Sequence, residues 1–229
     1  MRKDKVLVIA AMDEEVMALR KRMDNVLEKE HYGLRYLEGN LGEHMVFLAR
    51  SGVGKVNAAM TSSLLIALLN PHYVLNIGSA GGLQKGQAIG DVVVSNKLLY
   101  HDFDIGENTY DDDRFQFQAS FDLHQKACTI LEELGITYHE GLLVAGDQFV
   151  TAKESASILK RFPQAQAVDM ESAAIAAVCR QMGKSFLVLR SISDISLHED
   201  NDMTFEEYLP FASEQSARIC EMMIKKGVR

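Results

Sequence analysis

Residues 5–15 read Lys-Val-Leu-Val-Ile-Ala-Ala-Met-Asp-Glu-Glu, an unbroken apolar run that ends in three acidic side chains. Apolar runs without alternation are typical of strands in parallel sheets that are covered on both faces. A second run of this kind, Phe-Leu-Val-Leu, occupies residues 186–189. The two runs predict buried strands at Lys5–Ala10 and Phe186–Ile192 in the middle of one sheet.

Outward from these runs, short apolar segments alternate with amphipathic ones along the chain. Further strands are predicted at Leu34–Gly39, Met45–Arg50, Tyr73–Ile77, Asp91–Ser95, Glu140–Ala145 and Ala167–Met170. Helices are predicted at Glu14–Met23, Lys55–Leu69, Asp122–Leu134, Lys153–Arg161, Glu171–Met182 and Phe205–Lys226. This alternation indicates an α/β fold with a mixed, mostly parallel central sheet flanked by helices.

No linker or repeat divides the 229 residues, so we expect a single domain over residues 1–229. The segment 101–120 contains three consecutive aspartates, at 111–113, and shows no regular pattern. A structureless loop of this length is uncommon in a compact domain. We therefore expect this segment to be either functional or disordered.

The composition excludes several classes of protein. Lys and Arg number 24 against 32 Asp and Glu, a net charge of −8 that argues against nucleic-acid partners, which are bound through cationic side chains. Three scattered cysteines, at 128, 179 and 220, predict free buried thiols rather than a disulfide framework. No segment approaches the ~20 apolar residues of a membrane span, and no signal peptide is evident. We expect a cytoplasmic protein without membrane partners.

Familiar nucleotide motifs are absent from the glycine-rich segments. Ser51–Lys55 lacks the P-loop pattern, because Ala49 and Val56 stand where that motif needs Gly and Ser or Thr. Gly78–Gly82 lacks the dinucleotide fingerprint. The chain also has no G-x-S-x-G elbow, and its histidines form no H-x-x-x-H pair. The sequence thus indicates neither a metal nor an organic cofactor.

Polar side chains follow the predicted strands, at the edge where ligands of open α/β sheets bind. Carboxylates end four of five such strands, and the fifth is followed by a small-residue turn with Ser79. A single carboxylate there is usually a helix cap, whereas several together suit a ligand with hydroxyls and a basic ring. The carboxylates are Asp13, Glu14, Glu15, Asp147, Asp169, Glu171 and Asp194, and Phe149 adds an aromatic ring.

Eight segments in order connect the chain to a known family. They are Ala11–Val16, Ser51–Lys55, Asn76–Gly82, Gly90–Val92, Tyr100–Asp102, Ala145–Phe149, Val168–Glu171 and Arg190–Asp194. In these segments the chain resembles the 5′-methylthioadenosine/S-adenosylhomocysteine nucleosidases of the nucleoside phosphorylase superfamily. The resemblance implies hydrolysis of the N-glycosidic bond of an adenine nucleoside, with release of adenine and the 5′-thio-ribose.

The resemblance also implies catalytic roles. Glu15 would activate the attacking water with the help of Arg190. Asp194 would protonate adenine N7, and Ser193 would position Asp194. General chemistry agrees with these roles, because nearby carboxylates stabilise an oxocarbenium-like sugar in glycoside hydrolysis.

Binding roles follow from the same resemblance. Glu171 would bind the ribose hydroxyls, with Met170 packed against the sugar. Phe149 would stack on adenine, and the backbone of Val150 would read the edge of the base. The remaining expected binding residues line the sugar, the base or the 5′ group, and they are Met12, Val53, Ser79, Gly81, Asp169 and Phe205.

Water is the expected nucleophile rather than phosphate. Related phosphorylases hold phosphate with arginines after the first strand and beside the Gly-Ser turn. This chain has Met12–Glu15 at the first place and Asn76–Ile77 at the second. Carboxylates repel phosphate, so the sequence favours hydrolysis.

Two departures from the family leave alternatives open. The segment Tyr100–Tyr110 is more acidic than its family counterpart, and Asp169 replaces a glutamate. Another 5′-modified adenine nucleoside, such as 5′-deoxyadenosine or aminofutalosine, is therefore an alternative substrate. A non-catalytic nucleoside-binding module is a third possibility. The resemblance implies a homodimer, because in the family the loop that corresponds to the segment after Tyr100 crosses the dimer interface.

Overall fold

The computed structural model describes residues 3–107, 109–197 and 201–227. Its strands are β1 (Lys5–Ala10), β2 (Asp24–His31), β3 (Leu34–Leu41), β4 (His44–Arg50), β5 (Tyr73–Gly82), β6 (Val92–Tyr100), β7 (Phe117–Gln118), β8 (Tyr138–Ala145), β9 (Ala165–Asp169) and β10 (Ser185–Ile195). Its α-helices are α1 (Asp13–Arg20), α2 (Lys55–Leu69), α3 (Phe121–Leu134), α4 (Ala152–Arg161), α5 (Ser172–Gln181) and α6 (Asn201–Lys225).

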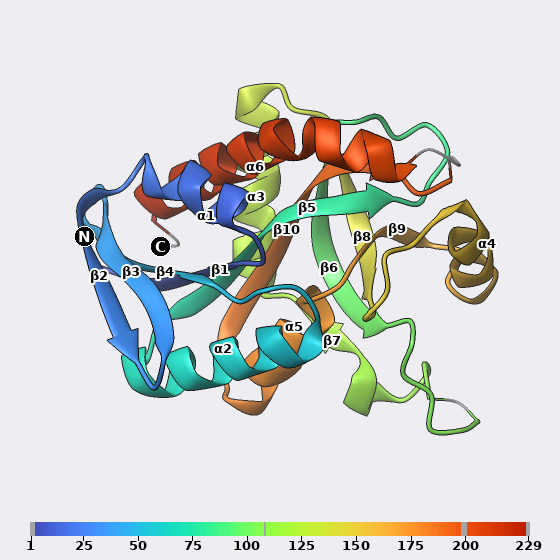
Figure 1. Cartoon of the computed structure of the whole chain (residues 1–229), viewed down its shortest axis with the longest axis horizontal. Helices are drawn as coiled ribbons and strands as arrows, with labels where there is room; N and C mark the ends of the chain where they lie inside the picture. Colours follow the sequence, from blue (N-terminus) through green and yellow to red (C-terminus); the bar gives the residue numbers. More distant parts are fainter. Residues whose placement is uncertain (1–2, 108, 198–200, 228–229) are drawn as a thin grey trace.

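The strands form one mixed sheet in the order β10-β6-β8-β9-β5-β1-β4-β3-β2, with β7 paired to β6 (Figure 1). Because β10 also pairs with β5, the five strands β10, β6, β8, β9 and β5 close into a ring. The strand β1 lies between β4 and β5 and is parallel to both. The predicted fold class, a central sheet flanked by helices, is confirmed.

Helices cover both faces of the sheet, and the side chains of β1 show why. Val6 and Val8 pack into a core with α1, α3 and α6, whereas Leu7 and Ile9 pack into a second core with α2 and α5. All four side chains are fully buried. The unbroken apolar run at the start of the chain is thus the signature of a strand with a core on each side.

Two strands extend beyond the predicted ends. The segment Gly78–Gly82 belongs to β5, so the prediction of a turn there is wrong, and β10 likewise runs on to Ile195. The cause is mutual pairing: β5 and β10 stay in parallel register as far as Gly82, with one bulge between Ile192 and Asp194. Bulges re-aim side chains next to active sites. Ser193 and Asp194 are therefore carried by a strand and not by a loop.

Two strands were not predicted, the two-residue β7 and the longer β2. The sequence of β2, Asp-Asn-Val-Leu-Glu-Lys-Glu-His, is mostly exposed along its length. It lies at the edge of the sheet and pairs only with β3 among the strands of the described chain. A polar edge strand buries no alternating face, so it leaves no period-two pattern to detect.

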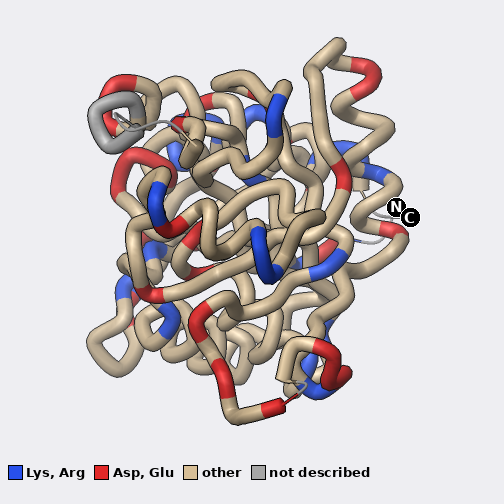
Figure 2. The backbone as a smooth tube through the Cα atoms, turned by 90° about the vertical axis from the view of Figure 1, so that its right-hand side faces the viewer, with Lys and Arg blue, Asp and Glu red and all other residues tan. Residues whose placement is uncertain are grey.

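The segment 101–120 is mostly irregular, with a 3-10 turn at Asp113–Phe115 and the short β7. Arg180 of α5 anchors it by donating to the backbone carbonyls of Asp113 and Gln116. Figure 2 shows Lys and Arg interspersed with Asp and Glu rather than gathered in one stripe. Within the described residues, none of the helices has the length and apolar character needed to cross a membrane.

Candidate active site

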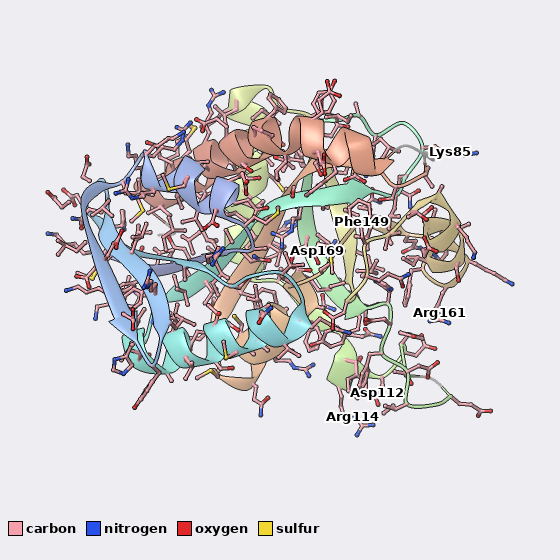
Figure 3. All side chains as sticks on the ribbon, viewed as in Figure 1. Lys85, Asp112, Arg114, Phe149, Arg161 and Asp169 are labelled. Carbon is pink, nitrogen blue, oxygen red and sulfur yellow. The ribbon has the colours of Figure 1, made fainter. Side chains whose placement is uncertain are left out.

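One cavity lies at the carboxyl ends of β1, β5, β9 and β10, where the ring of strands meets α1 and α5. Every residue that the sequence analysis expects to act in catalysis or binding lines it: Met12, Glu15, Val53, Ser79, Gly81, Phe149, Val150, Asp169, Met170, Glu171, Arg190, Ser193, Asp194 and Phe205. Phe149 and Asp169 mark its place near the middle of Figure 3, whereas Asp112 and Arg114 lie at the rim of the molecule.

Glu15 sits in the first turn of α1 and is almost completely buried. Its Oε2 accepts hydrogen bonds from the backbone N–H of Ala11 at 2.9 Å and of Met12 at 3.0 Å. Its Oε1 accepts from the Ser79 N–H at 3.0 Å and from the Ser79 hydroxyl at 3.3 Å. Burial raises the pKa of Glu15, and the charge of Arg190 and these N–H donors oppose that rise only in part. Glu15 is therefore a fixed carboxyl group with the raised pKa of a general base.

Two glycines of β5 leave room for the carboxylates. A Cβ at Gly78 would lie 2.5 Å from Glu15 Oε1, and its φ of +152° is unfavourable for other residues. A Cβ at Gly81 would lie 2.0 Å from the Ser196 hydroxyl and 3.1 Å from Asp194 Oδ2. The small residues that follow Ile77 are thus required by the side chains that approach the strand.

Asp194 is held by two hydroxyls. The Ser193 hydroxyl donates to Oδ1 at 2.9 Å, and the Ser196 hydroxyl reaches Oδ2 at 3.4 Å. Ser193 lies at the bulge of β10, and its hydroxyl is also 3.5 Å from the Ala80 carbonyl oxygen. This clamp fixes a carboxyl group at the cavity wall, where it can exchange a proton with a bound base.

Glu171 precedes α5 and faces Glu15 across the cavity. Its Oε1 accepts from the Gly54 N–H at 2.9 Å. Burial and the neighbouring charge of Asp169 raise the pKa of Glu171 to about 7, against the opposing charge of Arg190. A carboxylate with one oxygen held by the backbone keeps the other for ligand hydroxyls.

Arg190 and Asp169 form a buried pair beside the two glutamates. Arg190 donates to Asp169 Oδ2 from Nε at 2.8 Å and to the Asn76 side-chain oxygen at 2.6 Å, so among the described contacts its charge reaches Glu15 only through space. Asp169 Oδ1 accepts from the Ser172 hydroxyl at 2.8 Å. Both Asp169 oxygens accept hydrogen bonds from protein groups, and the residue anchors Arg190.

The mouth of the cavity is apolar. Phe149 and Phe205 meet edge to face with ring centroids 5.8 Å apart, and Phe149 is 42 % exposed. Val53, half exposed, and Met12 and Met170 also line the cavity. A flat base can enter beside Phe149, and apolar surface remains for a substituent that points outward.

Five further lining residues were not singled out from the sequence: Ala11, Ala80, Gln148, Val168 and Ser196. Four of them lie next to residues that were named, so the strand ends already marked their neighbourhood. Ser196 gave no such signal, because a serine two positions after an aspartate is common. Its contact with Asp194 depends on the extension of β10 that the sequence did not predict.

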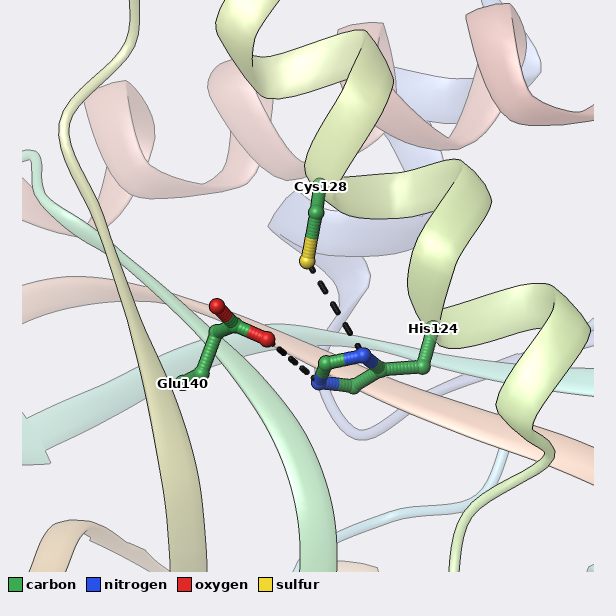
Figure 4. A group of neighbouring side chains, drawn as sticks. All are labelled: His124, Cys128 and Glu140. Atoms are coloured by element: carbon green, nitrogen blue, oxygen red, sulfur yellow. Dashed lines mark hydrogen bonds and ion pairs between the residues drawn. The ribbon is translucent and has the colours of Figure 1, made fainter.

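Away from the cavity, His124, Cys128 and Glu140 form a cluster with the chemistry of a metal site, with one candidate ligand atom from each within 4.8 Å of the others. The Cys128 sulfur lies 3.9 Å from His124 Nδ1, whereas Glu140 lies 3.4 Å from Nε2. Figure 4 shows the two contacts on opposite nitrogens of the ring. One imidazole ligates one ion through one nitrogen, so this ring orientation places Cys128 and Glu140 at opposite nitrogens rather than bringing three ligands to one point. Burial and Glu140 raise the Cys128 thiol pKa to about 12, which keeps the thiol protonated.

Comparison with known proteins places this geometry in a family context. The model of the Phosphorylase superfamily matches residues 5–225. A 5′-methylthioadenosine/S-adenosylhomocysteine nucleosidase from an Exiguobacterium species is 39 % identical over 229 aligned residues, which cover 97 % of this chain and 98 % of the relative.

Solved structures agree closely with the fold. The Neisseria meningitidis 5′-methylthioadenosine/S-adenosylhomocysteine nucleosidase, in complex with methylthio-immucillin-A, superposes with a TM-score of 0.92 at 35 % identity, covering 98 % of this chain and 100 % of the other. The Colwellia psychrerythraea nucleosidase, in complex with adenine, gives a TM-score of 0.91 at 35 % identity over 97 % of this chain and 95 % of the other.

Proposed function

The chain belongs to the phosphorylase superfamily, and from that membership we propose that it hydrolyses the N-glycosidic bond of 5′-methylthioadenosine and S-adenosylhomocysteine, releasing adenine and the 5′-thio-ribose. Nucleosidases of that specificity are similar to it over nearly their whole length. One observation carries the proposal: the carboxyl groups of Glu15, Glu171 and Asp194 surround a single cavity that has an aromatic ring at its mouth.

Asp194 is the general acid in this proposal. Its carboxyl group donates a proton to N7 of adenine, so that the C1′–N9 bonding electrons leave with a neutral base. The Ser193 hydroxyl, 2.9 Å from Oδ1, keeps the carboxyl group in one orientation. Protonation of the leaving base is the step that water alone performs poorly, and a positioned acid contributes about 10²–10⁴-fold.

Glu15 is the general base. It takes a proton from the water that adds to C1′ of the sugar, which leaves the hydroxyl on C1′. The Ser79 hydroxyl makes the longest of its four hydrogen bonds, at 3.3 Å, so this is the bond that a water can most readily replace. The negative charges of Glu15 and Glu171 also stabilise the oxocarbenium-like sugar.

Glu171 and Phe149 supply the binding geometry. The Glu171 oxygen that is not held by Gly54 accepts hydrogen bonds from the ribose hydroxyls, with Met170 against the sugar. Phe149 stacks on adenine, and the backbone of Val150 reads the edge of the base. Val53 and Phe205 offer apolar surface to the 5′-thio group.

Water is favoured over phosphate by the charges of the cavity. Among the described residues that line it, Arg190 is the one cationic side chain, and it is already paired with Asp169. The carboxylates Glu15 and Glu171 would repel an anionic nucleophile. A neutral water meets no such barrier.

A homodimer belongs to the same proposal. Val56 and Met60, one helical turn apart on α2, are 77 % and 52 % exposed. Exposed apolar side chains that cluster in this way mark interaction surfaces. A second copy covering this surface would place apolar groups beside the open mouth of the cavity at Val53.

Two further properties are proposed with it. One domain comprises residues 1–229, since the family model already spans nearly all of the chain. The protein acts in the cytoplasm, where buried thiols stay reduced: Cys128, Cys179 and Cys220 are all free and buried.

The test is adenine release from 5′-methylthioadenosine, S-adenosylhomocysteine, 5′-deoxyadenosine and aminofutalosine, by wild type and by Asp194→Asn. We expect the two thio-nucleosides to be the best substrates and the variant to lose turnover while still binding 5′-methylthioadenosine in a calorimeter. Faster release from a nucleoside without sulfur would reassign the substrate. Binding without any turnover by wild type would make the protein a nucleoside-binding module.

A further inference from the structure

Three charged residues with no role so far meet at one side of the cavity: Lys55 at the start of α2, Asp102 after β6, and Asp147 after β8. The Lys55 ammonium donates to Asp102 Oδ1 at 2.5 Å. The backbone N–H of Asp147 donates to the other oxygen, Oδ2, at 2.8 Å. Asp102 therefore joins a helix start to a loop that is far away in the sequence.

A return contact closes these residues into a network. The backbone N–H of Lys55 donates to Asp147 Oδ1 at 2.7 Å, and the Lys55 ammonium lies 3.7 Å from Asp147 Oδ2. Burial would raise the pKa of Asp102, but the bonds from Lys55 and from the Asp147 amide outweigh it and hold the pKa below its ordinary value. Asp102 is thus ionised across the neutral range, and the network is intact there.

Two glycines leave room for the aspartate side chains of this network. A Cβ at Gly146 would lie 2.9 Å from Asp102 Cγ, and a Cβ at Gly54 would lie 3.1 Å from Asp147 Oδ1. The Lys55 ammonium also lies 5.5 Å above the centre of the Tyr100 ring. The absence of a side chain at Gly54 and Gly146 therefore lets the two aspartates lie close against the backbone.

The network touches both halves of the site through neighbouring residues. Gly54, next to Lys55, gives its N–H to the Glu171 carboxylate at 2.9 Å, which is the proposed sugar contact. Asp147 lies two residues before Phe149, the proposed stacking ring. A shift of α2 relative to the loop after β8 would displace the sugar-binding and base-binding groups from each other.

We propose that Lys55, Asp102 and Asp147 are positioning residues, which fix the sugar-binding and the base-binding groups of the site relative to each other. This rests on the proposed nucleosidase function. Misplacement by about 1 Å can cost 10²-fold in rate, because the reacting atoms leave alignment. The side chains of Lys55 and Asp102 are 21 % and 28 % exposed. Solvent-accessible ion pairs add little to the stability of the fold. Loss of this network should therefore lower the catalytic rate more than the stability.

Lys55→Met and Asp102→Asn, singly and together, test the proposal with 5′-methylthioadenosine. Each single variant is expected to lower kcat about 10- to 100-fold, the usual effect of losing a supporting contact, and to raise KM less. The double variant is expected to lose no more than the worse single one, since residues that act as a unit are not additive. Lys55→Arg keeps the charge and is expected to recover most of kcat.

Lys225→Met is the matched control. It removes the same charge from a helical ion pair with Glu221, at the other end of the chain, and should leave kcat unchanged. Thermal unfolding of every variant is expected to stay close to that of wild type. Single variants with kcat within twofold of wild type, or losses that multiply in the double variant, would overturn the network. A wild type that releases no adenine would instead overturn the proposed function.

Discussion

Asp169 and Arg190 form a buried ion pair, in which Asp169 Oδ2 lies 2.8 Å from Nε and 2.7 Å from Nη2 of the guanidinium. The pair is almost completely inaccessible to solvent on both sides. It holds a positive charge between Glu15 and Glu171, where that charge opposes the effect of burial on both carboxyl groups. The shorter aspartate at this position therefore serves the electrostatics of the site.

Asp169→Ala is expected to destabilise the protein by about 3–5 kcal/mol, because it leaves a buried guanidinium without its partner. Urea unfolding, followed by circular dichroism, measures the change. Asp112→Ala is the control: it breaks the ion pair with Arg114, whose side chain is 74 % exposed, and should change stability by less than about 1 kcal/mol. Equal losses of unfolding free energy in the two variants would show that the buried pair stabilises the fold no more than an exposed pair does.

Glu15→Gln is expected to lower kcat about 10²–10⁴-fold, because an amide cannot accept the proton of the attacking water. In wild type, kcat/KM should fall on the acidic side at a pH above the ordinary glutamate value of 4.5, since burial raises the pKa of Glu15. A pH profile of both enzymes measures this. Near-normal turnover by the variant would remove Glu15 from the mechanism.

Glu171→Gln is expected to weaken substrate binding but to stabilise the protein at pH 8. The folded-state pKa of Glu171, about 7, lies above the unfolded value of 4.5. Wild type therefore loses stability as the pH rises from 4.5 through 7, when the buried carboxyl group ionises. The variant lacks this loss and should be more stable at pH 8 by about 3 kcal/mol, with little difference at pH 4.5. Urea unfolding at the two pH values decides, and a variant that is less stable at pH 8 would contradict the raised pKa.

Met60→Glu is expected to convert the proposed homodimer to a monomer with reduced kcat/KM. Burying an unpaired charge on the apolar face of α2 in the interface would cost too much free energy. Sedimentation equilibrium at micromolar concentration measures the mass. Tyr32→Glu changes another exposed apolar residue, on the β2–β3 turn, and serves as the control, with no effect on mass. A wild-type monomer with full activity would refute the dimer.

Much of the fold is evident from the sequence because burial leaves periodic patterns. The run Val6–Ala10 identifies a strand between two cores, and the helix at Lys55–Leu69 has the predicted ends. The edge strand β2 buries no face and leaves no pattern. The extra length of β5 and β10 depends on their pairing with each other, which no local pattern reveals.

The cavity lining is likewise predictable, because carboxylates after buried strands converge at one edge of the sheet. What the sequence does not reveal is which group each carboxylate meets. The sequence does not show, for example, that Asp169 pairs with Arg190. The contacts of Lys55 with Asp102 and Asp147 join segments distant in the chain, so they required the folded structure. The contact of Ser196 with Asp194 is local, but it depends on the extension of β10.

The most direct test of the central claim is the identity of the sugar product formed from 5′-methylthioadenosine in the presence of inorganic phosphate. Mass spectrometry and phosphorus NMR distinguish free 5-methylthioribose from its 1-phosphate. We predict free 5-methylthioribose together with adenine, at a rate that does not change when phosphate is added. Formation of the 1-phosphate, with release that requires phosphate, would contradict the account and make the enzyme a phosphorylase.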